Sequence, residues 1–337
     1  MPTPCPFDPE LGKLLAGAPP EYCGTHTPES IRKVAALYST PTQTMEEFIG
    51  DRPIQAVDYT VPGYQGAEIG ITVFTRKDRK LAPGTAPAFY YMHGGGMVMG
   101  FRTMNSEFLL PYVEQFDGVF AAVEYRLAPQ HPHPVPVEDC YAGLAWFSQQ
   151  GEKLGFDPKR IMVVGCSSGA GLAAGTALLA RDRGGPHIAW QLLLAPMLDD
   201  RNATLSTRQY EAHGVWNATS NATGWGALLG DKVGGPDVPI YAAPARAVDT
   251  ELGLANLPAT FLDVGSAEVF RDEVVAYATG IWAVGGTADL HIWAGGFHGF
   301  DMWGFPRLAR EALAARQNWV RRMLEWDSVS ESFAVPL

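Results

Sequence analysis

Short apolar runs alternate with segments of helical spacing along most of this chain. The apolar runs predict strands at 54–61, 68–75, 88–92, 119–124, 161–164, 188–194, 259–264 and 290–293. Helical spacing predicts helices at 29–38, 137–150, 170–180, 272–284 and 306–324. Short buried strands that alternate with helices are typical of a mostly parallel sheet covered by helices on both faces. The pattern therefore predicts an α/β fold.

One segment, from 199 to about 248, interrupts this alternation. It is rich in Gly, Asn, Thr and Pro. Long loops without secondary structure are uncommon in compact domains unless they are functional. We interpret the segment as an insertion that forms a cap, to which residues 1 to about 50 contribute; an ordinary surface loop is the alternative. A capped single domain over 1–337 accounts for a length that alone would suggest two domains.

Composition and charge narrow the function classes. Hydrophobic residues make up 47% of the chain and charged residues 18%, against about 25% charged residues in average proteins. The net charge of −11 argues against nucleic acid as a partner. No apolar run reaches the roughly 20 residues that span a bilayer, and no secretory leader is visible. We expect a cytoplasmic protein without a membrane span.

Cysteines and sequons add little to this picture. The cysteines lack metal-binding or CxxC spacing, so we expect reduced thiols; they are Cys5, Cys23, Cys140 and Cys166. Without a secretory leader, we attribute the Asn-x-Thr sequences to chance; they start at Asn202, Asn217 and Asn221. The His131-x-His133 pair is not expected to bind a metal.

Residues 165–169 read Gly-Cys-Ser-Ser-Gly, between an apolar strand and a helix of small residues. A nucleophile that stands above a sheet needs a tight strand-to-helix turn, which glycines two residues on either side allow. Ser168 would need a glycine where Cys166 stands. The register therefore predicts Ser167 as the nucleophile.

Residues 169–174 also fit the dinucleotide-binding pattern G-x-G-x-x-A. That pattern normally follows the first strand of a βαβ unit and has an acidic residue about 20 positions later. Here several predicted strands precede it, and the residues near Leu194 are apolar. We favour tight helix packing beneath the turn and expect no cofactor.

A second glycine-rich turn, His93-Gly94-Gly95-Gly96, follows the strand at 88–92. Attack on an ester carbonyl places negative charge on its oxygen, which preorganised backbone N–H groups stabilise. The residue after the nucleophile, here Ser168, supplies a further N–H. A flexible glycine turn is the alternative. We expect His93 to anchor the turn and not to act in catalysis.

His298 lies in a glycine-rich loop after the last strand and is the predicted base. In this fold the orienting acid lies between the nucleophile and the histidine in chain order. Asp263, Glu268 and Asp272 all meet that condition. We expect Asp263 to pair elsewhere, and Asp272 to begin the next helix, where a carboxylate suits the helix dipole.

Together these segments resemble the hormone-sensitive lipase family of esterases over about residues 85–325. The matching segments are 93–96, 125–129, 133–139, 165–169, 268–273 and 298–300. The resemblance implies an α/β-hydrolase fold with a helical cap and cofactor-free carboxylesterase activity. It also implies Gly95 and Gly96 as oxyanion donors and Glu268 as the orienting acid.

In this family the strand-to-helix turn that carries the nucleophile, called the nucleophile elbow, usually reads Gly-Asp-Ser-Ala-Gly-Gly. This sequence departs from that pattern. Cys166, Ser168 and Ala170 stand where the family has Asp, Ala and Gly. The missing carboxylate bears on substrate scope and pH optimum more than on the type of reaction. Cys166 is disfavoured as a nucleophile, because the turn presents Ser167 outward.

The hypothesis is a serine carboxylesterase that hydrolyses short-to-medium acyl or aryl esters through an acyl-enzyme. An amide, lactone or natural-product acyl hydrolase with the same triad is the alternative, and a non-catalytic receptor on the same fold is a remote one. The partner is a small-molecule ester, and a homodimer is compatible with these features. The residues expected to line the pocket are Met97, Phe101, Tyr210 and Trp216; packing of a cap onto the core is their other possible role.

Overall fold

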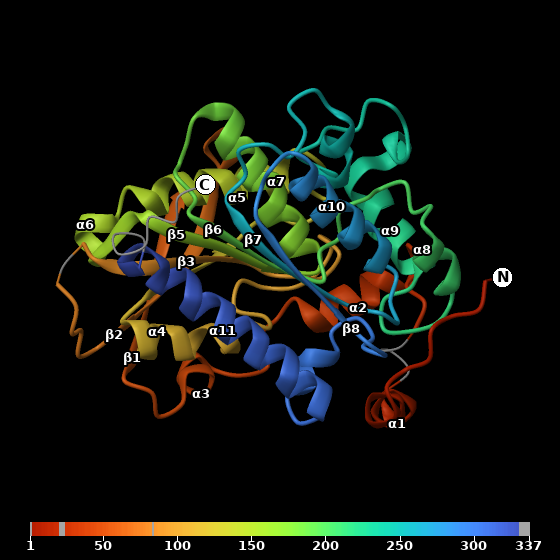
Figure 1. Ribbon diagram of the computed structural model, residues 1–337, viewed down its shortest axis with the longest axis horizontal. Helices are drawn as coiled ribbons and strands as arrows, with labels where there is room; N and C mark the ends of the chain where they lie inside the picture. Colours follow the sequence, from red (N-terminus) through yellow and green to blue (C-terminus); the bar gives the residue numbers. More distant parts are fainter. Residues whose placement is uncertain (1, 20–23, 83, 330–337) are drawn as a thin grey trace.

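The computed structural model describes residues 2–19, 24–82 and 84–329, and within them eight strands form one sheet (Figure 1). The strand order is β1-β2-β4-β3-β5-β6-β7-β8. β2 runs antiparallel to both β1 and β4, and all the other pairs are parallel. The strands are β1 Ile54–Pro62, β2 Glu68–Arg76, β3 Ala86–Met92, β4 Val119–Glu124, β5 Phe156–Cys166, β6 Trp190–Leu194, β7 Ala259–Gly265 and β8 Ala288–Trp293.

Helices cover both faces of the sheet, as the alternation predicts. α5, α7 and α10 contribute to one buried apolar cluster, and α3, α4 and α11 to the other (Figure 1). Apolar residues on each helix face the sheet, and their burial is the main driving force for this packing. The bounds are α3 Met45–Ile49, α4 Leu110–Phe116, α5 Val135–Ser148, α6 Gly151–Leu154, α7 Ser168–Arg183, α10 Arg271–Ala283 and α11 Arg307–Val329.

Several elements differ from the hydrophobic pattern, and β5 and α4 are the clearest examples. β5 begins at Phe156, before the predicted start at 161, and its first part carries partly exposed polar residues. Phe156 pairs with Ala86 and stacks on Phe147, with ring centroids 4.6 Å apart. α4 was not predicted, because a helix this short, opened by a proline, shows no clear helical period.

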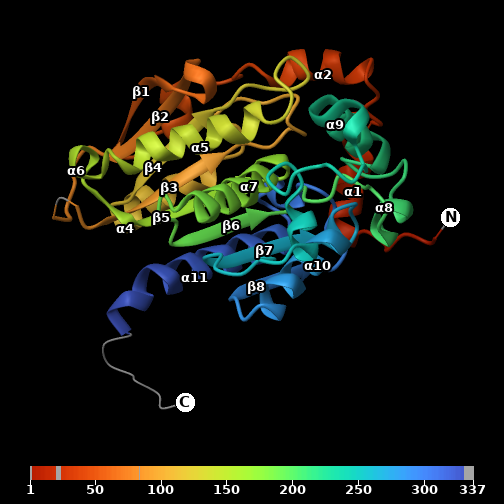
Figure 2. The same cartoon turned by 90° about the horizontal axis from the view of Figure 1, so that it is seen from above.

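The N-terminal segment and the 199–248 insertion pack against each other at one end of the sheet (Figure 2). The insertion contains helices and is not a plain loop. The backbone N–H of His26 donates to Ser220 Oγ at 2.9 Å, and Asn217 Nδ2 donates to Thr25 Oγ1 at 2.9 Å. His26 is buried. The helices of these segments are α1 Pro9–Gly17, α2 Ser30–Tyr38, α8 Leu205–Gln209 and α9 Ala218–Leu229.

The three sequon asparagines hold the insertion together. Asn217 caps α9 by accepting from the N–H of Ser220 at 3.0 Å. Asn221 Nδ2 donates to Asn202 Oδ1 at 2.9 Å, and Asn202 Nδ2 donates to the carbonyl of Ala218 at 2.9 Å. A glycan would attach to Nδ2, and the Nδ2 of each of the three asparagines already donates within the protein. The structure thus supports chance as the origin of the sequons.

In the described part of the chain, no helix is both long and apolar enough to cross a membrane. Cys5, Cys140 and Cys166 carry free thiols, and Cys23 lies outside the described residues. His131 and His133 belong to no group of three or more potential metal ligands among the described residues.

Candidate active site

Ser167 stands on the turn between β5 and α7 with φ 56° and ψ −124°. Left-handed backbone of this kind costs roughly 1–3 kcal/mol at a residue other than glycine. The turn is tight because no side chain separates the strand from the helix. A Cβ at Gly165 would collide with the backbone of Gly169, and one at Gly169 with the carbonyls of Met92 and His93. The two glycines therefore allow a strained turn that presents Ser167.

Ser167, His298 and Glu268 form a continuous hydrogen-bonded chain. The distance from Ser167 Oγ to His298 Nε2 is 2.9 Å, and that from His298 Nδ1 to Glu268 Oε2 is 2.7 Å. Glu268 is 2% exposed, and its other oxygen accepts from the N–H of Gly265 at 3.0 Å. The ring of Phe270 meets His298 edge-on, with centroids 5.1 Å apart. The structure thus brings together the predicted nucleophile, base and acid.

Close backbone contacts hold the acid loop beside the base loop. The N–H of Ala267 donates to the carbonyl of Gly296 at 3.0 Å, and that of Ser266 to Trp293 at 2.8 Å. A Cβ at Gly265 would collide with the Gly296 carbonyl. These contacts fix the spacing between the Glu268 and His298 segments.

The two other candidate acids have different partners. Asp263 Oδ2 pairs with Arg316 Nε at 2.7 Å and accepts from Trp293 Nε1 at 3.2 Å. Asp272 accepts from the N–H of Ser206 at 2.7 Å and pairs with Arg271 at 2.7 Å. Of the three carboxylates, the geometry favours Glu268 as the partner of the histidine.

The glycine turn after β3 lies against the elbow. Gly95 and Gly96 have φ of 111° and 62°, and Ser168 Oγ accepts from the N–H of Met97 at 3.1 Å. Within the described residues, the N–H groups of Gly95, Gly96 and Ser168 donate to no acceptor of the protein. Unengaged donors beside a nucleophile are suited to stabilising an oxyanion.

The model of a protein family whose description is "alpha/beta hydrolase fold" matches residues 89–302. Esterase LipI of Mycobacterium tuberculosis is 31% identical over 290 residues, 85% of this chain and 85% of that protein. The chain belongs to the alpha/beta hydrolase fold family. Carboxylesterase NlhH of Mycobacterium tuberculosis is 28% identical to this hydrolase over 287 residues, 84% of this chain and 85% of that protein.

Solved structures agree with this assignment. A bacterial heroin esterase has a TM-score of 0.83 at 33% identity, covering 94% of this chain and 98% of that chain. A Pyrobaculum calidifontis esterase has a TM-score of 0.79 at 27% identity, covering 96% and 99%. The resemblance to the hormone-sensitive lipase family is confirmed, and the hydrolase is a carboxylic ester hydrolase.

Trp216, from the insertion, packs directly onto the glycine turn of this esterase. A Cβ at Gly96 would lie 2.5 Å from the Trp216 ring. The indole Nε1 donates to Asn221 Oδ1 at 3.3 Å, and Asn221 in turn donates to Asn202. The buried Asn221 amide, itself held by Asn202, thus fixes the ring over the turn.

The other expected pocket residues have different surroundings. Met97 is buried, and its Cε lies 3.9 Å from the position that a Cβ on Gly171 would take, so it packs on α7. The Tyr210 hydroxyl donates to the carbonyl of Cys5 at 3.0 Å, which ties the insertion to the N-terminal segment. Phe101 is half-buried. Met97 directly follows Gly96 in the chain, and of the other three residues Trp216 has a described contact with Gly96.

Cys166 occupies the position of the family's carboxylate beside the nucleophile. Its Sγ lies 3.1 Å from the hydroxyl of Tyr91, which donates to the carbonyl of Met104 at 2.7 Å. Burial raises the pKa of the Cys166 thiol to about 11. The thiol is therefore neutral at physiological pH and adds no charge next to Ser167. Nothing in the sequence pattern identified Tyr91 as its partner.

His93 lies at the start of the glycine turn and contacts Tyr125 and Gly94. Its ring stacks on Tyr125, with centroids 4.2 Å apart, and the Tyr125 hydroxyl donates to the His93 carbonyl at 2.7 Å. The ring Nδ1 lies 2.7 Å from the carbonyl of Gly94. Burial lowers the pKa of His93 from 6.5 to about 4. The ring is thus neutral at physiological pH and suited to anchoring.

This pKa shift predicts an acid-sensitive contribution to stability. Between pH 6.5 and about 4 the unfolded chain binds a proton at His93 that the folded chain does not, so the free energy of unfolding falls as the pH falls. One such group contributes at most about 1.4 kcal/mol per pH unit. The test is denaturant unfolding of wild type and His93→Asn across this range. The stability difference between them should shrink towards pH 4; a constant difference would contradict the assignment.

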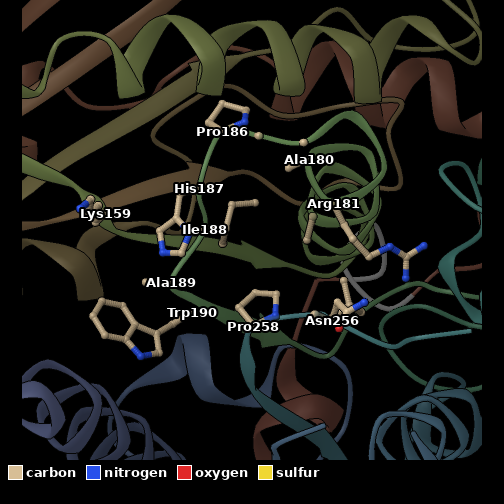
Figure 3. A pocket seen from close by; sticks show the side chains of 14 residues that line it. Lys159, Ala180, Arg181, Pro186, His187, Ile188, Ala189, Trp190, Asn256 and Pro258 are labelled. Atoms are coloured by element: carbon tan, nitrogen blue, oxygen red, sulfur yellow. The ribbon is translucent and has the colours of Figure 1, made fainter. Parts of the chain in front are cut away.

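An open hollow of about 730 Å³ lies at the amino ends of β6 and β7 (Figure 3). Its wall includes Lys159, His187, Trp190 and Pro258. Ser167 follows β5 at its carboxyl end, so the hollow lies at the opposite edge of the sheet. We assign it no part in ester hydrolysis.

Proposed function

We propose that this esterase hydrolyses short-to-medium acyl or aryl carboxylic esters through an acyl-enzyme on Ser167. The observation that carries the proposal is the hydrogen-bonded chain from Ser167 Oγ through His298 to Glu268, 2.9 and 2.7 Å long at its two links. A serine, a base and an orienting acid in hydrogen-bond contact are the requirements for nucleophilic acyl transfer.

His298 Nε2 takes the Ser167 proton as the serine oxygen attacks the ester carbonyl. The Glu268 carboxylate accepts from Nδ1–H, which fixes the imidazole tautomer and stabilises the imidazolium that forms. The imidazolium then returns the proton to the departing alcohol, leaving the acyl group on Ser167. Water, deprotonated by His298, attacks this acyl-enzyme. Collapse of the second tetrahedral intermediate breaks the bond to Ser167 Oγ, which takes back the proton from His298, and the carboxylic acid is released.

The negative charge of each tetrahedral intermediate falls on the former carbonyl oxygen. We propose the N–H groups of Gly95, Gly96 and Ser168 as its donors, because they are free of other acceptors within the described residues. One such donor is typically worth about 3–4 kcal/mol in the transition state. Ser168 Oγ contributes indirectly, by holding the turn at Met97.

The preference for short chains rests on Trp216. We propose that the N-terminal segment and the insertion act as a cap that carries this ring to Gly96. A rigid indole at the oxyanion turn suits a compact acyl or aryl group and limits the room for a long chain. Lining by Met97, Phe101 and Tyr210, a cytoplasmic location and a homodimer stay predictions.

A series of acyl esters from butyl to lauryl tests this preference. Each methylene that the pocket accepts contributes about 0.8 kcal/mol, so kcat/KM should rise roughly four-fold per methylene at most and then fall where the pocket ends. Trp216→Ala should move that fall to longer chains. Trp282→Ala is the matched control, because Trp282 lies on α10 and is 47% exposed.

Two results would refute the proposed pocket. One is a wild-type optimum at the longest chains. The other is a profile that Trp216→Ala leaves unchanged.

A further inference from the structure

α11 carries a buried arginine under the active site. Arg316 is 3% exposed and lies on the sheet face opposite α7. Its Nε pairs with Asp263 Oδ2 at 2.7 Å, and its Nη1 pairs with Asp301 Oδ2 at 2.6 Å. One guanidinium therefore bridges two carboxylates from different segments.

Each carboxylate belongs to a segment that carries a member of the triad. Asp301 lies in the short η5 helix, Phe300–Trp303, directly after the His298 loop. Asp263 lies in β7, just before Gly265, whose N–H donates to Glu268. Arg316 thus connects the segment of the base to the segment of the acid without touching either side chain.

Arg316 and Asp263 are both buried, so loss of their ion pair should disturb the surrounding structure. Asp263 is 1% exposed, and burial raises its pKa even though Arg316 acts in the opposite direction. The two carboxylates in turn raise the pKa of Arg316 above its ordinary value. Removing the guanidinium would leave the buried Asp263 and the partly buried Asp301 without their shared positive charge, which favours separation of their segments.

We propose that Arg316 is a positioning residue for the triad. It holds the His298 loop at hydrogen-bond distance from both Glu268 and Ser167, acting through Asp301 and Asp263. This role depends on the proposed triad. It extends the set of residues that control the triad to Arg316 of α11, a helix on the other face of the sheet. The alternative is a bridge that stabilises the fold and has no effect on the geometry of the triad.

Arg316→Met separates the two roles. Because Arg316 contacts no substrate, loss of positioning should lower kcat and leave KM within about two-fold. A small displacement of catalytic groups can cost about 10²-fold, and we expect a loss of that size. Arg316→Lys, which keeps the charge and one donor, should restore part of kcat.

Arg181→Met is the matched control. The side chain of Arg181 is 8% exposed, and it donates to the carbonyls of Gly253 and Ala255 near the hollow at the opposite edge of the sheet. It should lose stability while keeping wild-type kcat. If Arg316→Met does not fold, Asp301→Asn takes its place, since it weakens the same bridge and retains a side chain of the same size.

A spectroscopic readout completes the test. The proton that His298 Nδ1 shares with Glu268 should give a low-field proton NMR signal in wild type and Arg181→Met, and a lost or shifted one in Arg316→Met. Unchanged kcat and an unchanged signal in a folded, destabilised Arg316→Met would overturn the proposal, as would a change in KM alone. Failure of the triad itself would appear separately, as wild-type protein that a fluorophosphonate does not label at Ser167.

Discussion

Ser167→Ala should lower kcat for a simple aryl ester by about 10⁶-fold, because loss of the nucleophile removes the action of the whole triad. The fold should survive. The contacts that hold the turn use the backbone of Ser167: its N–H donates to Leu194, and its carbonyl accepts from Ala170, Gly171 and Met197. Alanine keeps all of these. Steady-state rates and thermal unfolding of the two proteins provide the comparison.

Covalent labelling identifies the nucleophile independently of rates. A fluorophosphonate should modify Ser167, as located by mass spectrometry of the digested protein, and should not modify Ser167→Ala or the denatured chain. Ser168 is buried, and its Oγ accepts from Met97. The Cys166 thiol is neutral because burial raises its pKa. A label on Ser168 or Cys166 would contradict the assignment.

The strands were predictable because buried strands in a doubly covered sheet are continuous apolar runs. The sequence could not supply their order. β4 lies between β2 and β3, and β2 runs antiparallel to it. Pairings of this kind depend on contacts between strands and leave no mark on the period of either one. The polar first half of β5 was missed because only Phe156 in it pairs with β3, opposite Ala86, and a single pairing leaves no period in the sequence.

The turn at Ser167 and the glycine turn were predictable because each is formed by residues that are neighbours in the sequence. A strained turn needs glycines at fixed offsets, so the sequence around Ser167 reports the geometry directly. The contact of Trp216 with Gly96 and the bridge at Arg316 leave no such signal. Both join residues far apart in the chain, and an arginine on an amphipathic helix is usually exposed.

Residues 263–272 contain three acids, and the mechanism depends on which of them orients His298. Glu268→Gln should lower kcat by about 10⁴-fold, the typical effect of replacing an orienting carboxylate by its amide. The amide oxygen can still accept from the N–H of Gly265, so the loop should keep its conformation. The amide nitrogen, however, can donate to His298 Nδ1, which favours the wrong tautomer for a base at Nε2.

Asp272→Asn is the matched control for Glu268→Gln. Asp272 bonds to Ser206 and Arg271 and makes no contact with His298, so its amide should leave kcat within about two-fold of wild type. Asp263→Asn should fall between the two, because Asp263 makes no hydrogen bond to His298 but pairs with Arg316, which bridges to Asp301 after the His298 loop. Measuring kcat for the three variants on one aryl ester gives their order. If Asp263→Asn or Asp272→Asn caused the large loss and Glu268→Gln did not, a different carboxylate would orient the histidine, and the hydrogen bond between Glu268 and His298 would be dispensable for catalysis.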